Sequence, residues 1–196
     1  MRTNEAALAD VEQTLSDPGP VDRPRLRRLV DELGQMAQQT PAVADRCYAG
    51  QARVLAQLEE YEQALVAVEK ALLLMPQDDA LMILRGDIHR AADEYSRALQ
   101  DYTEVLNARP YSVTARVRRA ELHQARGQFD EALTDVNSAL KYEPRSLRLV
   151  YRRGLILMDL RRVKDAQADF QAVVRLSVDG DLKQKARERL RELGQR

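Results

Sequence analysis

The chain has 196 residues, of which 44% are apolar, 32% are charged and only 5% are aromatic. Its formal net charge is zero, which argues against a uniformly basic protein of the kind that coats nucleic acids. Leu, Ala, Arg, Glu and Gln dominate, and runs of β-branched residues between turns are missing, so a β-rich fold is excluded. The single cysteine, Cys47, excludes an internal disulfide framework and a multi-cysteine zinc site.

Residues 1–40 are predicted to form a degenerate helix pair that caps the N-terminal end of the fold. The first helix is marked by the apolar stripe Leu8, Val11 and Leu15. The segment SDPGPVDRP predicts a loop, and a second helix is marked by Leu26, Leu29, Val30, Leu33 and Ala37. The first 15 residues lack the apolar segment of a signal peptide, and no run approaches the ~20 apolar residues of a membrane span. We therefore expect a soluble, cytoplasmic protein.

Three prolines, Pro76, Pro110 and Pro144, lie 34 residues apart and indicate a repeat. Four blocks, 45–78, 79–112, 113–146 and 147–180, align in register. Their eighth places are Ala52, Gly86, Ala120 and Gly154, and their twentieth places are Ala64, Ala98, Ala132 and Ala166. Each block predicts two helices, such as 80–92 and 95–108, which small residues allow to approach closely. The proline ends the second helix, and stacked pairs bury a common core.

Residues 181–196 are predicted to form a capping helix after the fourth block. Its apolar stripe is Leu182, Ala186, Leu190 and Leu193, with Asp181 as a start signal and Gly194 as a stop signal. Charge is concentrated here, because residues 145–196 hold 14 Lys and Arg against 7 Asp and Glu. This basic end suggests an anionic partner or simply a solvated surface.

The series of small residue, aromatic, alanine and proline resembles the tetratricopeptide repeat (TPR) family over residues 45–180. The segment GQFDEALTDVNSALKYEP, residues 127–144, is similar to the second helix and closing proline of that family. The resemblance implies an all-α fold, a right-handed α-α superhelix whose repeats occupy residues 41–180. It also implies a non-enzymatic adaptor or scaffold. The early aromatic of the first helix departs from the family, since the matching residues are Tyr48, Met82, Arg116 and Val150.

In this family the first helices line a concave groove that binds partner segments. The resemblance therefore implies a groove lined by Arg53, Ile83, Asp87, Arg90, Val117, Arg118, Glu121, Gln124, Arg148, Tyr151, Arg152, Leu155 and Met158. An apolar strip edged by arginines suits a peptide with apolar anchors and acidic side chains. Co-chaperone members hold a C-terminal carboxylate with a Lys/Asn/Arg clamp, and the matching residues here are Ala49, Arg53, Leu84, Thr114 and Arg118. Only Arg118 fits the clamp, so a heat-shock co-chaperone is not expected.

An arginine and an aspartate recur together in the last three blocks. The seventh and twenty-third places predict three structural ion pairs: Arg85 with Asp101, Arg119 with Asp135, and Arg153 with Asp169. The first block has Gln51 and Ala67 there, so both partners are replaced at once. We expect each arginine to pair with an aspartate of the facing second helix, in its own or an adjacent repeat, and to fix the register of these helices.

No phosphate loop, HExxH motif or nucleophile elbow is present, so we expect no catalytic residues, no metal and no cofactor. His89 and His123 both occupy the eleventh place, where the other blocks have Leu55 and Leu157, which favours a packing role over a zinc half-site.

Two alternatives to peptide binding remain open. A nucleic-acid-binding solenoid would use the basic residues Arg145, Arg148, Arg152, Arg153, Arg161 and Arg162 and the capping helix, but Tyr151 is the only aromatic among them that could stack on a base. The other is self-association, in which a repeat end or groove accepts a neighbouring copy of the chain.

Overall fold

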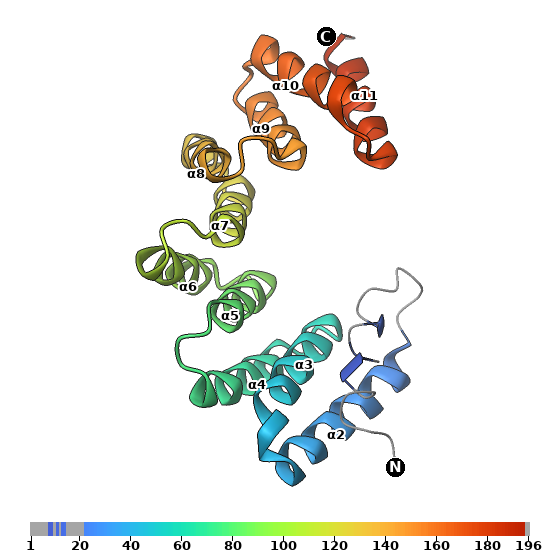
Figure 1. Ribbon diagram of the computed structural model, residues 1–196, viewed down its shortest axis with the longest axis vertical. Helices are drawn as coiled ribbons and strands as arrows, with labels where there is room; N and C mark the ends of the chain where they lie inside the picture. The colour runs from blue at the N-terminus through green and yellow to red at the C-terminus, as the bar shows by residue number, and fades with distance from the viewer. Residues whose placement is uncertain (1–7, 10, 12, 15–21, 195–196) are drawn as a thin grey trace. The chain divides into compact units, whose positions relative to one another are not determined.

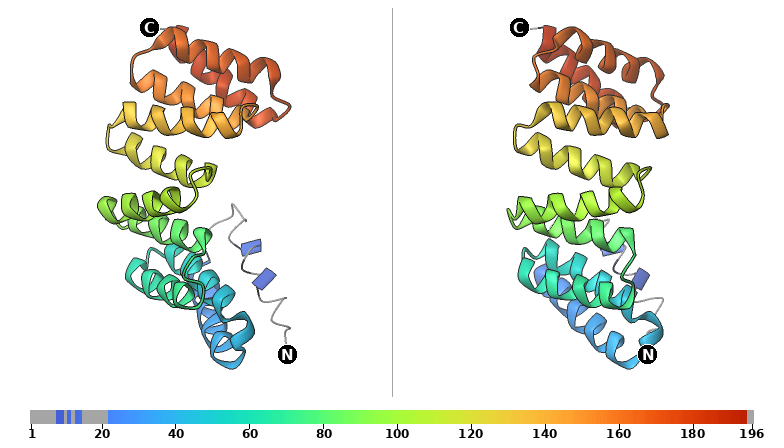
Figure 2. Two further views of the ribbon diagram at one scale, coloured as in Figure 1. Left: turned by 60° about the vertical axis from the view of Figure 1, so that its left-hand side comes forward. Right: turned by 90° about the vertical axis from the view of Figure 1, so that its left-hand side faces the viewer.

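A computed structural model describes residues 8, 9, 11, 13, 14 and 22–194, and every regular element in them is helical, which confirms the predicted all-α class. Within each compact unit, consecutive helices pack as antiparallel pairs, as Figures 1 and 2 show. The helices are α2 (Arg23–Gln39), α3 (Ala44–Gln57), α4 (Tyr61–Leu74), α5 (Asp79–Ala91), α6 (Tyr95–Ala108), α7 (Val113–Ala125), α8 (Phe129–Tyr142), α9 (Leu147–Asp159), α10 (Val163–Leu176) and α11 (Gly180–Gly194). A short 3-10 helix, Pro41–Val43, precedes α3.

The described residues fall into two compact units. The first unit extends to Asp101 and contains α2 to α5 and the start of α6. The second begins at Tyr102 and contains the rest of α6 and α7 to α11. In the second unit, α7, α9 and α11 form one layer and α8 and α10 form the other (Figure 1).

The turn inside each helix pair has one residue in the left-handed conformation, always at the same place in the block. Glu59, Asp93, Gly127 and Arg161 have φ between 60° and 72° and stand 34 residues apart, at the fifteenth place of each block. The next N–H returns to the carbonyl five residues earlier, as from Glu60 to Leu55 at 2.9 Å. This bond closes the first helix, and the left-handed residue reverses the chain.

Replacing Glu59 by glycine is expected to raise the free energy of unfolding by about 0.5–1 kcal/mol. A left-handed conformation costs a side-chain-bearing residue about 1–2 kcal/mol, and the larger chain entropy of glycine offsets part of that gain. Urea denaturation checks the value. The matched reverse change, Gly127→Ala, should lower stability, and a loss in both variants would contradict this assignment of strain.

The predicted small residues are buried inside the helix pairs. The alanines at the twentieth place have no exposed surface, namely Ala64, Ala98, Ala132 and Ala166. A Cβ atom added to Gly154 on α9 would lie 2.7 Å from Cε1 of Phe170 on α10. The ring of Phe170, itself fully buried, therefore occupies the space that any side chain at Gly154 would need.

The N-terminal cap is helical over its described residues. Leu26, Leu29, Leu33 and Ala37 of α2 are buried together with Leu8 and Val11 against α3, whereas Leu15 lies outside the described residues. The predicted loop extends too far, because Arg23 and Pro24 belong to the first turn of α2. The Asp22 carboxylate accepts the N–H of Arg25 at 3.1 Å, and proline is compatible with a first helical turn.

The helix of the C-terminal cap begins at Gly180, and its capping residue lies two residues before the predicted one. Asp181 is not the capping residue; Oδ1 of Asp179 accepts the N–H of Leu182 at 3.1 Å, while Asp181 forms an ion pair with Lys185 at 2.7 Å. The bond from Leu182 is also the main reason that the pKa of Asp179 is lowered, with a smaller contribution from Arg148. Gly194 is the last residue of α11 rather than the residue after it.

Cys47 is fully buried in α3, and burial raises the pKa of its thiol. Of the helices that the structure describes, none combines the length and apolar character that crossing a membrane requires.

Candidate partner-binding surface

Each of the three arginine and aspartate pairs is a two-point contact between the helices of one repeat. Nε and Nη2 of Arg119 on α7 donate to Oδ2 and Oδ1 of Asp135 on α8 at 2.8 and 2.7 Å. Arg153 and Asp169 repeat these distances between α9 and α10, and Nε of Arg85 lies 3.1 Å from both oxygens of Asp101. The aspartate side chains are only 5%, 5% and 9% exposed, so the charges are largely removed from water.

The arginines of the last two pairs also reach the second helix of the preceding repeat. Nη1 of Arg119 donates to Oγ1 of Thr103 on α6 at 3.2 Å, and Nη1 of Arg153 lies 3.5 Å from Oδ1 of Asn137 on α8. Each of these guanidinium groups therefore joins three helices, which the sequence pattern did not predict. The twenty-fifth place of each block, polar in Thr103 and Asn137, is the signal that could have revealed it.

The first repeat uses a different contact at the same place. The amide of Gln51 donates to the carbonyl of Val30 on α2 at 3.2 Å, and Ala67 is buried where the other repeats have aspartate. Gln51 thus joins the repeats to the N-terminal cap.

The two histidines close the turns of their own repeats. His89 is 8% exposed, and its Nδ1 lies 2.6 Å from Oε2 of Glu94, while Nδ1 of His123 lies 3.1 Å from Oε1 of Gln128. The two histidines therefore form hydrogen bonds in addition to packing between the helices. Among the described residues, no group of three or more His, Cys, Asp or Glu side chains could hold a metal ion.

The bond from His89 lowers the pKa of Glu94, and Arg97 lowers it further. A depressed carboxyl pKa contributes stability above the pKa of the unfolded chain, and this contribution is lost as the pH falls through the folded pKa. Between about pH 5 and pH 3, wild type should therefore lose more stability than Glu94→Gln. Urea denaturation at both pH values tests this, and equal losses in the two proteins would contradict it.

In the first unit, the predicted groove residues differ in how much surface they present. Arg53 on α3 is exposed, and Asp87 and Arg90 on α5 are partly buried. Ile83 is only 9% exposed, so its side chain offers a partner little surface.

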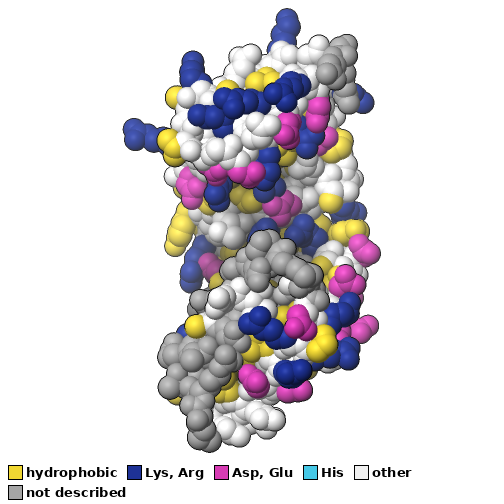
Figure 3. Space-filling view, turned by 90° about the vertical axis from the view of Figure 1, so that its right-hand side faces the viewer, with side chains coloured by type: hydrophobic (Ala, Val, Ile, Leu, Met, Phe, Trp, Pro, Cys, Tyr) yellow, Lys and Arg dark blue, Asp and Glu magenta, His cyan; other side chains and the backbone are white. Residues whose placement is uncertain are grey.

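In the second unit, a charged network joins the predicted groove residues of α7 and α9. The Glu121 carboxylate lies 3.2 Å from Nη1 of Arg118 and 2.7 Å from Nη2 of Arg152. One turn further, the amide of Gln124 donates to Asp159 at 2.6 Å. Two guanidinium groups thus share the Glu121 carboxylate, and Asp159 adds a second carboxylate nearby. Figure 3 shows Lys and Arg side chains next to Asp and Glu side chains on the face that carries α11, with apolar patches between them.

The predicted apolar strip lies beside the C-terminal cap. Leu155 and Met158 are partly buried and pack against a cluster that includes Ala186 and Leu193 of α11. The ring of Tyr151 lies 5.5 Å from that of Phe170, and Glu192 and then Tyr151 raise the pKa of Arg189 on α11 by hydrogen bonding. Val117 on α7 is also partly buried. The strip therefore supports α11 with part of its surface.

Most arginines of the alternative nucleic-acid surface are already paired with carboxylates. Arg152 and Arg153 contact Glu121 and Asp169, as described above. Arg162 lies 2.7 Å from Asp165, and Arg148 lies 3.4 Å from Asp179. These pairs compete with phosphate for the same donors.

Comparison with solved structures places the chain among TPR proteins. TTC0263, a thermophilic TPR protein in Thermus thermophilus, is 14% identical, with a TM-score of 0.71 over 95% of this chain and 98% of that one. YrrB, described as a TPR protein with an unusual peptide-binding site, is 17% identical, with a TM-score of 0.62 over 93% and 91%. The first TPR of Spaghetti (RPAP3), bound to the HSP90 peptide SRMEEVD, is 24% identical, with a TM-score of 0.54 over 61% and 92%. Because all three sequence identities are 24% or lower, this similarity establishes a shared fold and not a shared function.

A comparison with curated protein sequences returns no match. A family model described as tetratricopeptide repeat matches residues 50–113 and 117–180, which is more than half of the chain. Each match covers about two of the 34-residue blocks that the prolines delimit. The chain therefore belongs to the tetratricopeptide repeat family.

Proposed function

We propose that this chain is a non-enzymatic protein-interaction module, an adaptor that binds a peptide segment of a partner on its first helices. Membership of the tetratricopeptide repeat family supports the proposal. Two proteins of similar fold, YrrB and the first TPR of Spaghetti, are described as having a peptide-binding site or a bound peptide.

The observation that carries the proposal is the sharing of the Glu121 carboxylate by Arg118 and Arg152. The Arg152 side chain is 31% exposed, so an acidic side chain of a partner can approach its guanidinium. Leu155 and Met158 follow on the same helix and keep part of their apolar surface exposed. A peptide with one or two apolar anchors next to an acidic residue matches this surface in charge and polarity.

The expected partner differs from the heat-shock peptide. Of the positions that match the co-chaperone clamp, only Arg118 has a suitable side chain, whereas Ala49, Leu84 and Thr114 cannot hold a carboxylate by charge. We therefore expect selected peptides to bind more tightly than SRMEEVD.

Selection from a random peptide library, followed by fluorescence anisotropy, tests the proposal. The selected peptides should be rich in apolar and acidic residues, and Arg152→Gln should weaken them by about tenfold, the effect of one charge-assisted hydrogen bond. Arg175→Gln, the same charge change at an exposed place on α10, is the matched control. If both variants bind like wild type, the groove assignment is wrong. If single-stranded oligonucleotides bind instead, with a steep loss of affinity as salt rises, nucleic acid is the ligand.

A further inference from the structure

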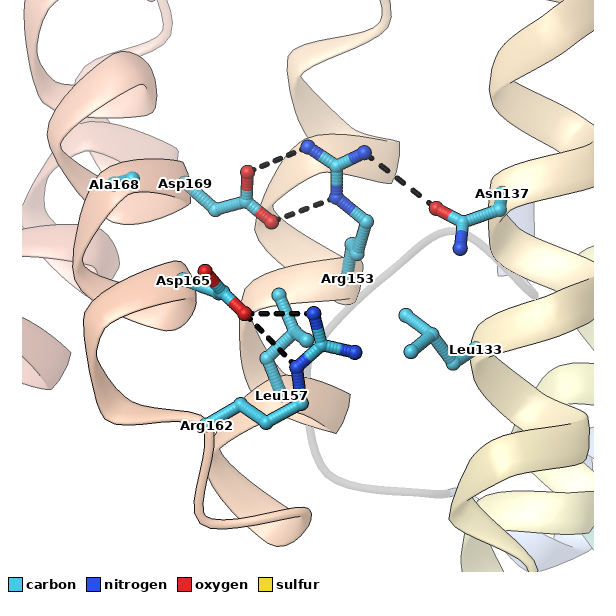
Figure 4. Close-up of a pocket in the computed structure, with 8 residues that line it drawn as sticks. All are labelled: Leu133, Asn137, Arg153, Leu157, Arg162, Asp165, Ala168 and Asp169. Carbon is cyan, nitrogen blue, oxygen red and sulfur yellow. Dashed lines mark hydrogen bonds and ion pairs between the residues drawn. The ribbon is translucent and has the colours of Figure 1, made fainter.

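A cleft of about 360 Å³ lies between α8 and α10, in the layer of second helices. Its floor comes from α9 through Arg153 and Leu157, and Leu133 and Asn137 of α8 form one wall. The other wall is α10 with Asp165 and Asp169, and Arg162 approaches from the turn that precedes it (Figure 4). The volume is at the lower end of the range for small-ligand sites. This surface is separate from the face of α7 and α9 that the proposed function uses.

The polar atoms of the cleft contain more donors than acceptors. Nε and Nη2 of Arg162 both contact Oδ2 of Asp165, at 2.8 and 2.7 Å. Its Nη1 donates to no acceptor in the part of the chain that the structure describes, and the same holds for the amide nitrogen of Asn137. Figure 4 shows the free end of Arg162 directed toward Leu133 and α8.

Arg153 adds a further donor. Its Nε and Nη2 are used by Asp169, and its Nη1 makes only the long 3.5 Å contact with Asn137. A guanidinium has five N–H groups and no acceptor, so one N–H of this Nη1 remains for a ligand. Oδ1 of Asp165 receives no hydrogen bond from the described residues of the cleft. Asp165 and Asp169 balance the charges of Arg153 and Arg162, so the cleft favours an acceptor-rich group through its unused N–H donors and not through net charge.

The fourth repeat differs from the second and third at the two places that form the histidine contact. In the second and third repeats, the eleventh place is His89 or His123, which bonds to Glu94 or Gln128 at the sixteenth place. The fourth repeat has Leu157 and Arg162 at these places. Leucine cannot bond to the guanidinium, so Arg162 turns to Asp165 three residues later and leaves its outer N–H groups facing the cleft.

We propose that this cleft binds a carboxylate on a short apolar stem, as in a glutamate side chain or a free dicarboxylate. The carboxylate oxygens accept from Arg162, Asn137 and Arg153, and the stem lies against Leu133, Leu157 and Ala168. A planar carboxylate matches the fork of an arginine better than a spherical anion does.

The test is an NMR titration of the whole ¹⁵N-labelled chain, observed at the Asn137 side-chain amide and the arginine Nε signals. The probes are glutarate, the blocked peptide acetyl-Ala-Glu-Ala-amide, and acetyl-Ala-Gln-Ala-amide as the uncharged control. Saturable shifts at Asn137 with either carboxylate, and none with the glutamine peptide, are expected. Binding by glutarate alone identifies a free metabolite as the ligand class, and binding by the peptide identifies a partner side chain.

Two variants distinguish specific binding in the cleft from nonspecific attraction of a carboxylate to the positive charge of the surface. Arg162 is exposed and lies outside the helix core, so Arg162→Gln should keep the fold, which thermal denaturation verifies. It should weaken carboxylate binding by about tenfold. Lys164→Gln makes the same charge change at an exposed residue that does not line the cleft, and it should leave binding unchanged. Equal losses in the two variants, or equal shifts with the glutamine peptide, would overturn the proposal. Neither variant touches the α7 and α9 surface, so peptide selection there tests the proposed function independently.

Discussion

Replacing Asp135 by alanine is expected to lower the free energy of unfolding by about 3 kcal/mol, the lower end of the range for breaking a buried ion pair. The Asp135 side chain is 5% exposed and receives two short hydrogen bonds from Arg119. Nη1 of Arg116 lies a further 3.8 Å from the same carboxylate. Without Asp135, these guanidinium groups remain half-buried with no opposite charge. The Asp135 carboxylate raises the pKa of Arg119 in the wild type by hydrogen bonding. Without that carboxylate the guanidinium still keeps its proton, because arginine is not deprotonated in proteins, so it cannot relieve the cost by becoming neutral.

A double-mutant cycle separates the free energy of the Arg119–Asp135 interaction from the other effects of substituting each residue. Arg119→Met with Asp135→Leu removes both charges and should recover most of the loss, because a buried pair contributes little net stability relative to apolar residues of similar size. Asp130→Ala, at an exposed residue of the same helix, is the matched control and should cost less than about 1 kcal/mol. Additive losses in the cycle would show that the pair does not fix the register of α7 against α8.

Replacing Gly154 by alanine is expected to destabilise the chain by about 1–3 kcal/mol, the usual cost of overpacking a core. The new methyl group would lie 2.7 Å from Cε1 and 3.0 Å from Cζ of the Phe170 ring, and that ring is fully buried. Chemical denaturation gives the value directly.

A second substitution makes the cause visible. Phe170→Leu shortens the side chain that blocks the site, so Gly154→Ala should cost less in that background than in wild type. Gly180→Ala is the matched control, because a Cβ there meets nothing within 4 Å. If Gly154→Ala is neutral, the close approach of α9 and α10 is not what requires glycine at this place.

The helices could be predicted from sequence because their signals repeat. The 34-residue spacing of Pro76, Pro110 and Pro144 places the pairs, so the expected helix 95–108 coincides with α6 and the expected helix 80–92 differs from α5 by one residue at each end. The recurrence of alanine at the twentieth place likewise indicates which surfaces meet. Because these prolines and alanines recur at the same place in successive repeats, each occurrence supports the helix boundaries inferred from the others.

Features decided by three-dimensional neighbours were harder to predict. The start of α11 depends on which carboxylate, that of Asp179 or that of Asp181, accepts a backbone N–H of the first helical turn. The conformation of the short loop between α10 and α11 decides this, and the sequence does not show it. Tyr151 occupies a groove position by register, but α11 lies outside the repeat pattern, and so its packing beside Tyr151 was not visible. The left-handed turn residue is glycine only in Gly127, so one repeat of four carried the usual signal.

The central claim is that the first helices of the second unit bind a peptide, and mapping the bound peptide by NMR tests it most directly. The selected apolar and acidic peptide is added to the ¹⁵N-labelled chain, and backbone amide shifts are recorded at saturation. We expect the largest shifts on α7 and α9, around Arg118, Glu121, Arg152 and Leu155. Shifts confined to α8 and α10, with those four residues unchanged, would contradict it.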